Sequence, residues 1–167
     1  MKLAYMTAPA RGDTDLILHQ LANDLAARGL TVSGLVQINT DRTDGGSCDM
    51  DVQVLPDGPV LRISQNLGRS ARGCRLDPAA LESAVGLVSA SLAQGADVLI
   101  INKFGKHEVD GRGFRDVIAD ALAMDIPVIV GLNVLNLAEF ESFAGGLAIR
   151  LPPERDAMEH WIGSTAT

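Results

Sequence analysis

Short apolar runs alternate with helical patterns along most of the chain. Residues 98–101 form a continuous run of Val, Leu and Ile, typical of a strand buried on both faces of a parallel sheet. Apolar side chains recur at helical spacing over residues 16–26, and Gly29 is a stop signal. The same alternation predicts strands at residues 3–6, 31–38, 128–131 and 146–151, and helices at about 78–94, 113–124, 137–143 and up to 161.

Strands that alternate with helices predict an α/β fold with a doubly wound, mostly parallel sheet. Residues 50–55 and 60–64 depart from this alternation, because they are two strand-like runs joined by Pro-Asp-Gly. We expect a hairpin insertion near residues 50–64. Ligands of doubly wound sheets bind at the carboxyl ends of the strands. The site is therefore expected where the loop of residues 7–13 meets the loop of residues 102–108.

Composition narrows the class of protein. The chain has 167 residues, of which 47% are hydrophobic and 21% charged, so a single globular domain over residues 1–167 is expected. Its net charge of −7 argues against nucleic-acid partners, because phosphate backbones would be repelled. No apolar stretch approaches the roughly 18 residues of a membrane span. Two Cys and no signal-peptide pattern predict a cytoplasmic protein without membrane insertion.

The loop after the first predicted strand stands where a phosphate-binding loop would be. Such a loop reads G-x-x-x-x-G-K-[ST], whereas residues 7–14 read T-A-P-A-R-G-D-T. Gly12 and Thr14 fit this pattern, but Asp13 replaces the lysine and Thr7 replaces the first glycine. The alternative is an ordinary strand-to-helix turn with Asp13 or Thr14 as the helix cap.

The apolar strand at residues 98–101 ends in a polar loop. In P-loop enzymes this strand ends in an Asp that holds the metal, often followed by a Glu that orients water. Here those positions are Asn102 and Lys103, and Lys106 follows shortly after. Two of the three lysines of the chain therefore lie in this loop, which suits an anion site or a solvated turn.

Residues 102–108, N-K-F-G-K-H-E, resemble the Asp-Glu-Ile-Gly-Lys-Met-Glu motif of the small P-loop nucleoside-triphosphatase family first described from thermophiles. Gly105, Lys106 and Glu108 are retained. The chain is also similar to an uncharacterised bacterial family, a domain of unknown function whose genes often lie near molybdate-transport genes. Residues 34–37, 48–50, 73–77 and 102–106 carry that similarity. The resemblance implies a P-loop NTPase-like fold and a molybdenum context.

Three charged positions of the triphosphatase family are changed to Asp13, Asn102 and Lys103. Losing a phosphate clamp and a metal-holding carboxylate removes several kcal/mol of transition-state stabilisation. The leading hypothesis is a degenerate P-loop-like protein that binds a small anion, either a nucleotide or a molybdenum species. A divergent nucleoside triphosphatase and a partner-binding subunit are the alternatives. The candidate binding residues are Thr7, Arg11, Gly12, Asp13, Thr14, Arg75, Asn102, Lys103, Lys106 and Glu108.

The predicted insertion contributes further candidates. Its basic run of Arg62, Arg69, Arg72 and Arg75 either closes over an anion as a lid or is a mobile charged loop. Cys48 and Cys74 could ligate a soft metal such as a molybdenum species, form a redox pair or be small buried hydrophobes.

The two charge reversals also predict a contact. Asp13 and Lys103 follow different strands at the same expected edge of the sheet. If those strands are neighbours, the two residues form an ion pair in the space of Mg²⁺ and the γ-phosphate.

Overall fold

The computed structural model describes residues 2–10, 12–40, 49–64 and 76–165. In this part of the chain seven strands form one sheet in the order β4-β3-β2-β5-β6-β1-β7. The strands are β1 Leu3–Met6, β2 Val32–Thr40, β3 Asp49–Leu55, β4 Val60–Arg62, β5 Val98–Phe104, β6 Val128–Leu132 and β7 Ile149–Arg150.

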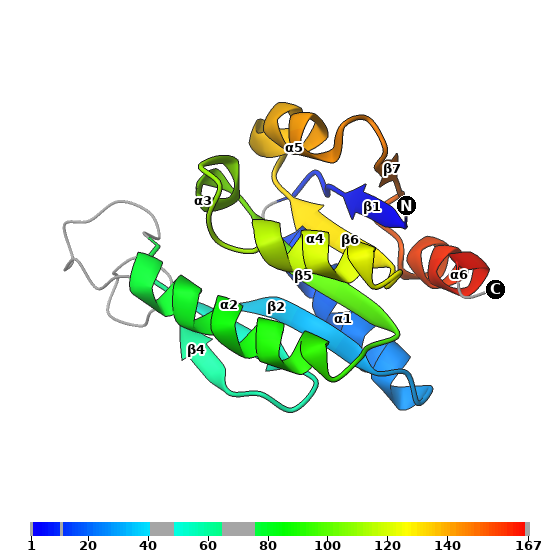
Figure 1. Ribbon diagram of the computed structural model, residues 1–167, viewed down its shortest axis with the longest axis horizontal. Helices are drawn as coiled ribbons and strands as arrows, with labels where there is room; N and C mark the ends of the chain where they lie inside the picture. The colour runs from blue at the N-terminus through cyan, green and yellow to red at the C-terminus, as the bar shows by residue number, and fades with distance from the viewer. Residues whose placement is uncertain (1, 11, 41–48, 65–75, 166–167) are drawn as a thin grey trace.

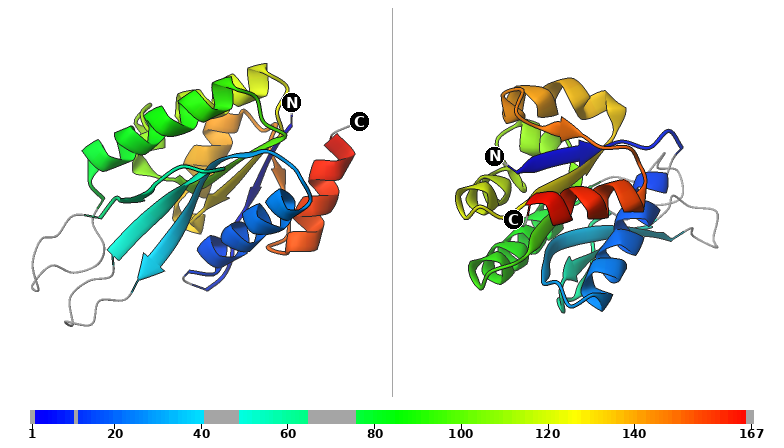
Figure 2. Two further views of the ribbon diagram at one scale, coloured as in Figure 1. Left: turned by 90° about the horizontal axis from the view of Figure 1, so that it is seen from below. Right: turned by 90° about the vertical axis from the view of Figure 1, so that its right-hand side faces the viewer.

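Helices cover both faces of this sheet, as Figures 1 and 2 show. Helices α1 and α6 pack on one face, and α2, α4 and α5 pack on the other. The described helices are α1 Asp13–Ala27, α2 Pro78–Ala93, α3 Lys106–Val109, α4 Arg115–Ala123, α5 Leu137–Ala144, α6 Arg155–Thr165 and the 3-10 helix η1 Val134–Asn136. The doubly wound α/β fold is therefore confirmed.

Strand β5 occupies the centre of the sheet because its side chains are apolar in both directions. It runs parallel to β2 on one side and to β6 on the other. Leu99 and Ile101 face the layer of α2, α4 and α5, whereas Val98 and Ile100 face α1 and α6. The continuous apolar run thus supplies both hydrophobic cores.

Close packing of β2 against β5 depends on Gly34. Its φ of +117° is strained for other residues, and a Cβ there would lie 1.9 Å from the carbonyl oxygen of Ile100. A side chain at this position would push the two central strands apart.

Helix α2 begins where the sequence predicts. The Asp77 side chain accepts hydrogen bonds from the N–H groups of Ala79, at 3.0 Å, and Ala80, at 3.4 Å. Pro78 occupies the first turn, where its missing N–H is not needed. These local signals explain why the start of this helix is readable from sequence.

The expected hairpin is present as β3 and β4, and it extends the sheet. Strand β3 pairs antiparallel with β2 at seven positions, and β4 pairs with β3. Val52 and Val54 are buried in the core with α2. Apolar side chains on β3 explain this result, since they can only be buried by extending the sheet.

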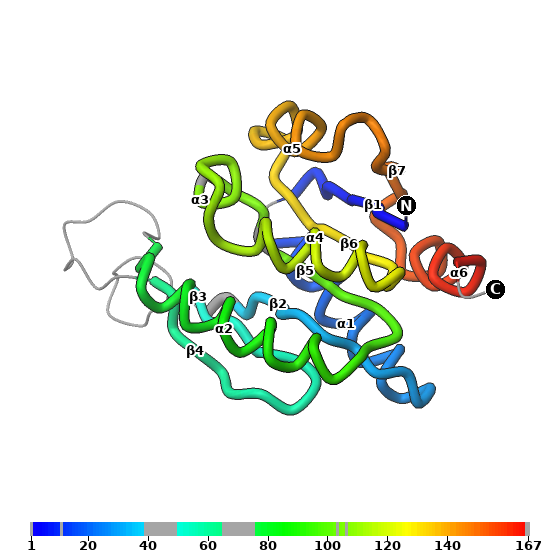
Figure 3. Tube along the Cα trace, viewed as in Figure 1, coloured from blue at the N-terminus to red at the C-terminus, as the bar shows by residue number. Residues whose placement is uncertain are grey.

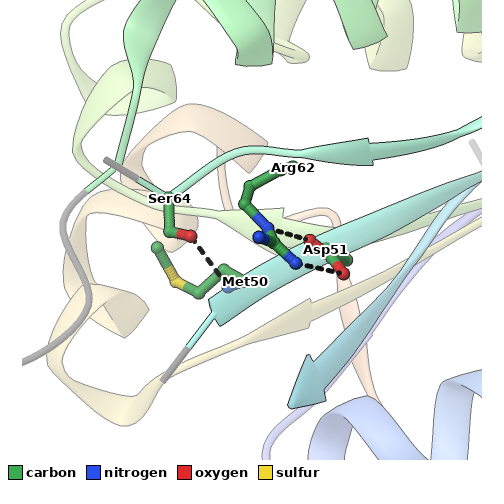
Figure 4. Close-up of polar contacts among 4 residues, drawn as sticks. All are labelled: Met50, Asp51, Arg62 and Ser64. Atoms are coloured by element: carbon green, nitrogen blue, oxygen red, sulfur yellow. Dashed lines mark hydrogen bonds and ion pairs between the residues drawn. The ribbon is translucent and has the colours of Figure 1, made fainter. Parts of the chain in front are cut away.

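Arg62 is engaged within this hairpin (Figure 4). Its Nε donates to Oδ1 of Asp51 at 3.0 Å, and a second guanidinium nitrogen lies 3.4 Å from Oδ2. The Met50 N–H donates to Oγ of Ser64 at 3.0 Å. Arg62 therefore makes a cross-strand ion pair, and an anion contact of the basic run stays a prediction. Arg69, Arg72 and Arg75 lie outside the described residues.

The last part of the chain differs from the prediction in detail. The final strand is only Ile149–Arg150 rather than residues 146–151, because Gly145 and Gly146 adopt positive φ angles that end α5. Helix α6 continues to Thr165, beyond the expected end at Trp161. Helix α3 and η1 follow β5 and β6 directly and were not predicted from the sequence (Figure 3).

Candidate functional site

Helix α1 begins at Asp13, seven residues after Met6, which is the carboxyl end of β1. Gly12 is the N-cap of α1 with a left-handed backbone, φ 84°, and no side chain caps the helix. The expected cap at Asp13 or Thr14 is therefore wrong, whereas the alternative of an ordinary strand-to-helix turn stays open. Asp13 and Asp15 lie in the first helical turn and are half-buried. Thr7 directly follows β1 and is also half-buried.

Asn102 lies at an irregularity in β5. Ile101 pairs with Val130 and Phe104 with Leu132, so two residues of β5 stand opposite one residue of β6. Asn102 is 5% exposed, and neither its Oδ1 nor its Nδ2 has a hydrogen-bond partner among the described residues. Buried polar groups in proteins are nearly always hydrogen-bonded, and one left unpaired lowers the stability of the fold by about 1–3 kcal/mol. The Asn102 amide is an exception to this rule and therefore calls for an explanation.

Gly131 of β6 brings the two P-loop-like positions together. A Cβ placed on Gly131 would lie 2.8 Å from Cγ2 of Thr14, 3.2 Å from Oδ1 of Asn102 and 2.5 Å from Cδ1 of Leu18. The start of α1 and the end of β5 therefore meet over this glycine, as the loop positions predict. Gly131 itself was missed as a site residue. A glycine within a fully buried strand, one residue before its end, is the signal that marks such a close approach.

The remaining candidates are spread more widely. Glu108 lies in α3, is 1% exposed and packs against Gly113, where a Cβ would come within 2.8 Å of its carboxyl group. The backbones of Lys103 and Lys106 belong to β5 and α3, but their side chains are not described. Arg11, Arg75, Cys48 and Cys74 lie outside the described residues.

The strand order bears on the ion pair expected between Asp13 and Lys103, which assumed that the strands before these residues are neighbours. Strand β6 lies between β1 and β5, so the two strands that lead to these residues are not neighbours. The condition under which the pair was expected is therefore not met. The ion pair itself stays a prediction.

An aromatic cluster lies between the last residue of β5 and helix α5. Phe104 packs edge-on against Phe140 of α5 with ring centroids 5.0 Å apart, and Tyr5 of β1 packs on the same ring at 5.3 Å. The Tyr5 hydroxyl donates to Oε1 of Glu141 at 3.2 Å. Burial raises the pKa of Tyr5, and the Glu141 carboxylate raises it further. This cluster ties β1, β5 and α5 together.

A separate cleft of about 560 Å³ lies between α2 and α4. Its described lining includes Glu82, His107, Arg112, Asp116 and Asp120, but neither Thr14 nor Asn102. In the described ranges, no three His, Cys, Asp or Glu side chains come together in a way that could hold a metal ion. None of the described helices is both long and apolar enough to cross a membrane.

Comparison with known proteins places the chain in a family. A family profile described as "Protein of unknown function (DUF2478)" matches residues 3–161. The chain belongs to this family. A related protein is "Molybdenum import ATP-binding protein ModC 2" of Bradyrhizobium diazoefficiens, which is 38% identical over 157 residues. The match covers 93% of this DUF2478 chain but only 17% of the length of that relative.

Two solved structures share the fold of this DUF2478 chain, each with a TM-score of 0.61. One is the solution structure of a human cancer-related nucleoside triphosphatase, with 17% identity over 99% of this chain and 96% of the other. The second is the crystal structure of THEP1 from the hyperthermophile Aquifex aeolicus, with 16% identity over 98% and 96%. The P-loop NTPase-like fold is thus confirmed.

Proposed function

We propose that this chain binds a nucleotide or another small oxyanion at a degenerate P-loop-like site, without hydrolysing it, in a molybdenum-related process. The observation that carries this proposal is Asn102, a buried amide beside the start of α1 whose two polar atoms have no partner among the described residues. A ligand that supplies the missing hydrogen bonds would remove the cost of burying this amide.

The first turn of α1 provides the second part of the proposed site. Backbone N–H groups at the start of a helix have no partner within the helix, and the helix dipole favours negative charge there. Gly12 lets the chain turn into α1, and no side chain caps the helix there, although the N–H of Asp13 donates to the carbonyl of Ala10 at 3.2 Å. Phosphate groups and other oxyanions are the ligands that such helix starts bind.

Hydrolysis is not expected from this set of residues. The position of the phosphate-clamping lysine is Asp13, and the position of the metal-holding carboxylate is Asn102. Each change removes a charge that stabilises the transition state of phosphoryl transfer in P-loop enzymes. Positioning by the fold alone leaves a binding site rather than a hydrolase.

The molybdenum context of the proposal is supported by the name of the relative at 38% identity. Because the chain spans only 17% of that protein, its activity and partners are not carried over as a whole. Molybdate is a tetrahedral dianion, so it could use the same hydrogen-bond donors as a phosphate group.

A thermal-shift panel with ATP, GTP, sulfate, molybdate and tungstate tests the binding proposal. A ligand at about a hundredfold excess over Kd should stabilise the protein by roughly 2–3 kcal/mol. Thr14→Ala should weaken this shift, whereas Ser83→Ala, which removes a hydroxyl from the exposed face of α2, should not.

Phosphate release with ATP or GTP and Mg²⁺ tests the absence of hydrolysis. We expect release at the rate of the protein-free control. Metal-dependent release that disappears in Thr14→Ala would instead support the divergent triphosphatase. If no ligand in the panel shifts the melting temperature, the binding proposal is wrong and the alternative of a partner-binding subunit gains support.

A further inference from the structure

The cleft between α2 and α4 is separate from the proposed oxyanion site. Its volume of about 560 Å³ falls within the range of about 300–1,000 Å³ that is typical of binding clefts. It lies on the face of the sheet that α2, α4 and α5 cover (Figure 1), and its described lining contains neither Thr14 nor Asn102. Anything that binds in this cleft is therefore independent of the oxyanion proposal.

Apolar and small residues from both helices line part of the cleft. They are Val85 and Gly86 of α2 and Val117 of α4. Val117 is 2% exposed and Val85 is half-buried. A Cβ placed on Gly86 would meet no atom within 4 Å, so the space above this glycine is open. An incoming side chain can reach this part of the cleft and pack its aliphatic atoms there.

Carboxylates stand on both walls of the cleft. On the α2 side, Oε1 of Glu82 accepts the N–H of Gly113 at 3.2 Å, which joins α2 to the segment before α4. On the α4 side, Asp116 and Asp120 are exposed and one helical turn apart, and among the described residues neither carboxylate has an ion-pair or hydrogen-bond partner. Like charges at this spacing repel each other and destabilise a helix. Cations placed against these two carboxylates would relieve that repulsion.

The balance of charge in the cleft decides what kind of partner fits. Arg112 is the one guanidinium of the described lining and stands against three carboxylates, so the net charge is −2 with His107 neutral. A second copy of this chain, or a nucleic acid, would bring more negative charge against the cleft and be repelled. A protein segment with Arg or Lys side chains complements it. The aliphatic stems of such side chains would cover the apolar lining while their charged ends reach the carboxylates.

We propose that the cleft between α2 and α4 docks an extended basic segment of a partner protein, with alternate Arg or Lys side chains against Asp116 and Asp120. In an extended segment, alternate side chains lie on one face about 7 Å apart. Residues four apart on a helix have their Cβ atoms about 5–6 Å apart, which is close to that spacing. One segment can therefore engage both carboxylates together, whereas a free amine with a single charge engages one.

Amide chemical-shift mapping by NMR tests this docking surface with the peptide acetyl-Ala-Arg-Ala-Arg-Ala-amide. We expect saturable binding, with the largest shifts at the N–H groups of Gly86, Gly113 and Asp120. Added salt should weaken the binding, because the charges of the cleft walls are exposed to solvent. The acidic peptide acetyl-Ala-Glu-Ala-Glu-Ala-amide should not bind.

Gly86→Leu tests the shape of the cleft while its charges stay intact. The leucine side chain enters open space, and leucine favours a helix more than glycine does, so this variant should fold. It should weaken binding of the basic peptide by about fivefold or more. Gly163→Leu is the matched control, because Gly163 is an exposed glycine of α6 that also has open space around it. It should bind the peptide as the unchanged protein does.

The double variant Asp116→Asn with Asp120→Asn tests the carboxylates while the shape of the cleft stays intact. It should weaken binding of the basic peptide by about tenfold or more. Its control, Glu154→Gln with Asp156→Asn, removes two negative charges at exposed positions at the start of α6, on the other face of the sheet. This control should change the affinity by less than about twofold.

Other results would overturn the inference and leave the oxyanion proposal untouched. Unchanged binding by Gly86→Leu, or equal losses in the two double variants, would show that overall negative charge attracts the peptide. Spermidine that binds as tightly as the peptide, with the same dependence on Asp116 and Asp120, would assign the cleft to free amines. A dimer of the unchanged protein that Gly86→Leu dissociates would assign it to a second copy of this chain.

Discussion

Replacing Asn102 with leucine should make the protein more stable. The two side chains have the same branched shape, but leucine has no polar atoms to leave unpaired in this buried position. An unsatisfied buried polar group costs about 1–3 kcal/mol, and the substitution removes that cost. Some of the gain is offset where the new methyl groups meet Thr14 and Leu18, since a crowded core resists added bulk. We expect a net gain of about 1–2 kcal/mol.

Thermal and denaturant unfolding measure this gain. For a chain of this size, 1 kcal/mol corresponds to a rise in Tm of roughly 2–4 °C. Asn133→Leu is the matched control, because the oxygen of Asn133 accepts the N–H of Leu135 at 2.9 Å at the end of the neighbouring strand. Losing that cap should cost about 0.5–2 kcal/mol, so the same substitution should have the opposite sign there.

A lower Tm for Asn102→Leu would refute the reasoning, because it would show that the amide is satisfied in the folded protein. A higher Tm with unchanged ligand binding would separate stability from function and remove the reason given for keeping an asparagine here. A higher Tm with weakened binding is the result that the structure predicts.

Two further predictions concern other parts of the fold. Gly34→Ala should destabilise the protein by about 3 kcal/mol or more in denaturant unfolding, because its Cβ would meet the Ile100 backbone, whereas Gly29→Ala, with open space around it, should cost only about 1 kcal/mol of backbone strain. Glu141→Gln should lower the raised pKa of Tyr5 but leave it above 10.0, since burial remains, and ultraviolet titration of the single tyrosine measures it. The contribution of Tyr5 to stability is fully present below pH 10.0 and is lost as the pH rises through its folded-state pKa, so in this variant the loss should begin at lower pH. An unchanged Tyr5 pKa, or equal costs for the two glycine variants, would contradict these explanations.

Local signals made much of the fold predictable from the sequence. The apolar run at residues 98–101 indicated the central strand because only a strand covered on both faces buries every side chain. Asp77 and Pro78 marked the start of α2 because a helix cap acts over three or four residues. The altered loop chemistry was equally visible, since Asp13 and Asn102 stand in recognisable positions.

Contacts between distant segments were decided only by the tertiary structure. Which strand lies between β1 and β5 depends on how the strands are ordered in the sheet, and no local pattern encodes that order. The hairpin joins the sheet because its apolar side chains need the cover of α2, which begins at residue 78. The meeting of Thr14 and Asn102 over Gly131 joins three segments far apart in the chain. The sequence determined which residues this site contains. The packing of β6 between β5 and β1 determined that these residues meet. The same packing buries the Asn102 amide without a partner among the described residues.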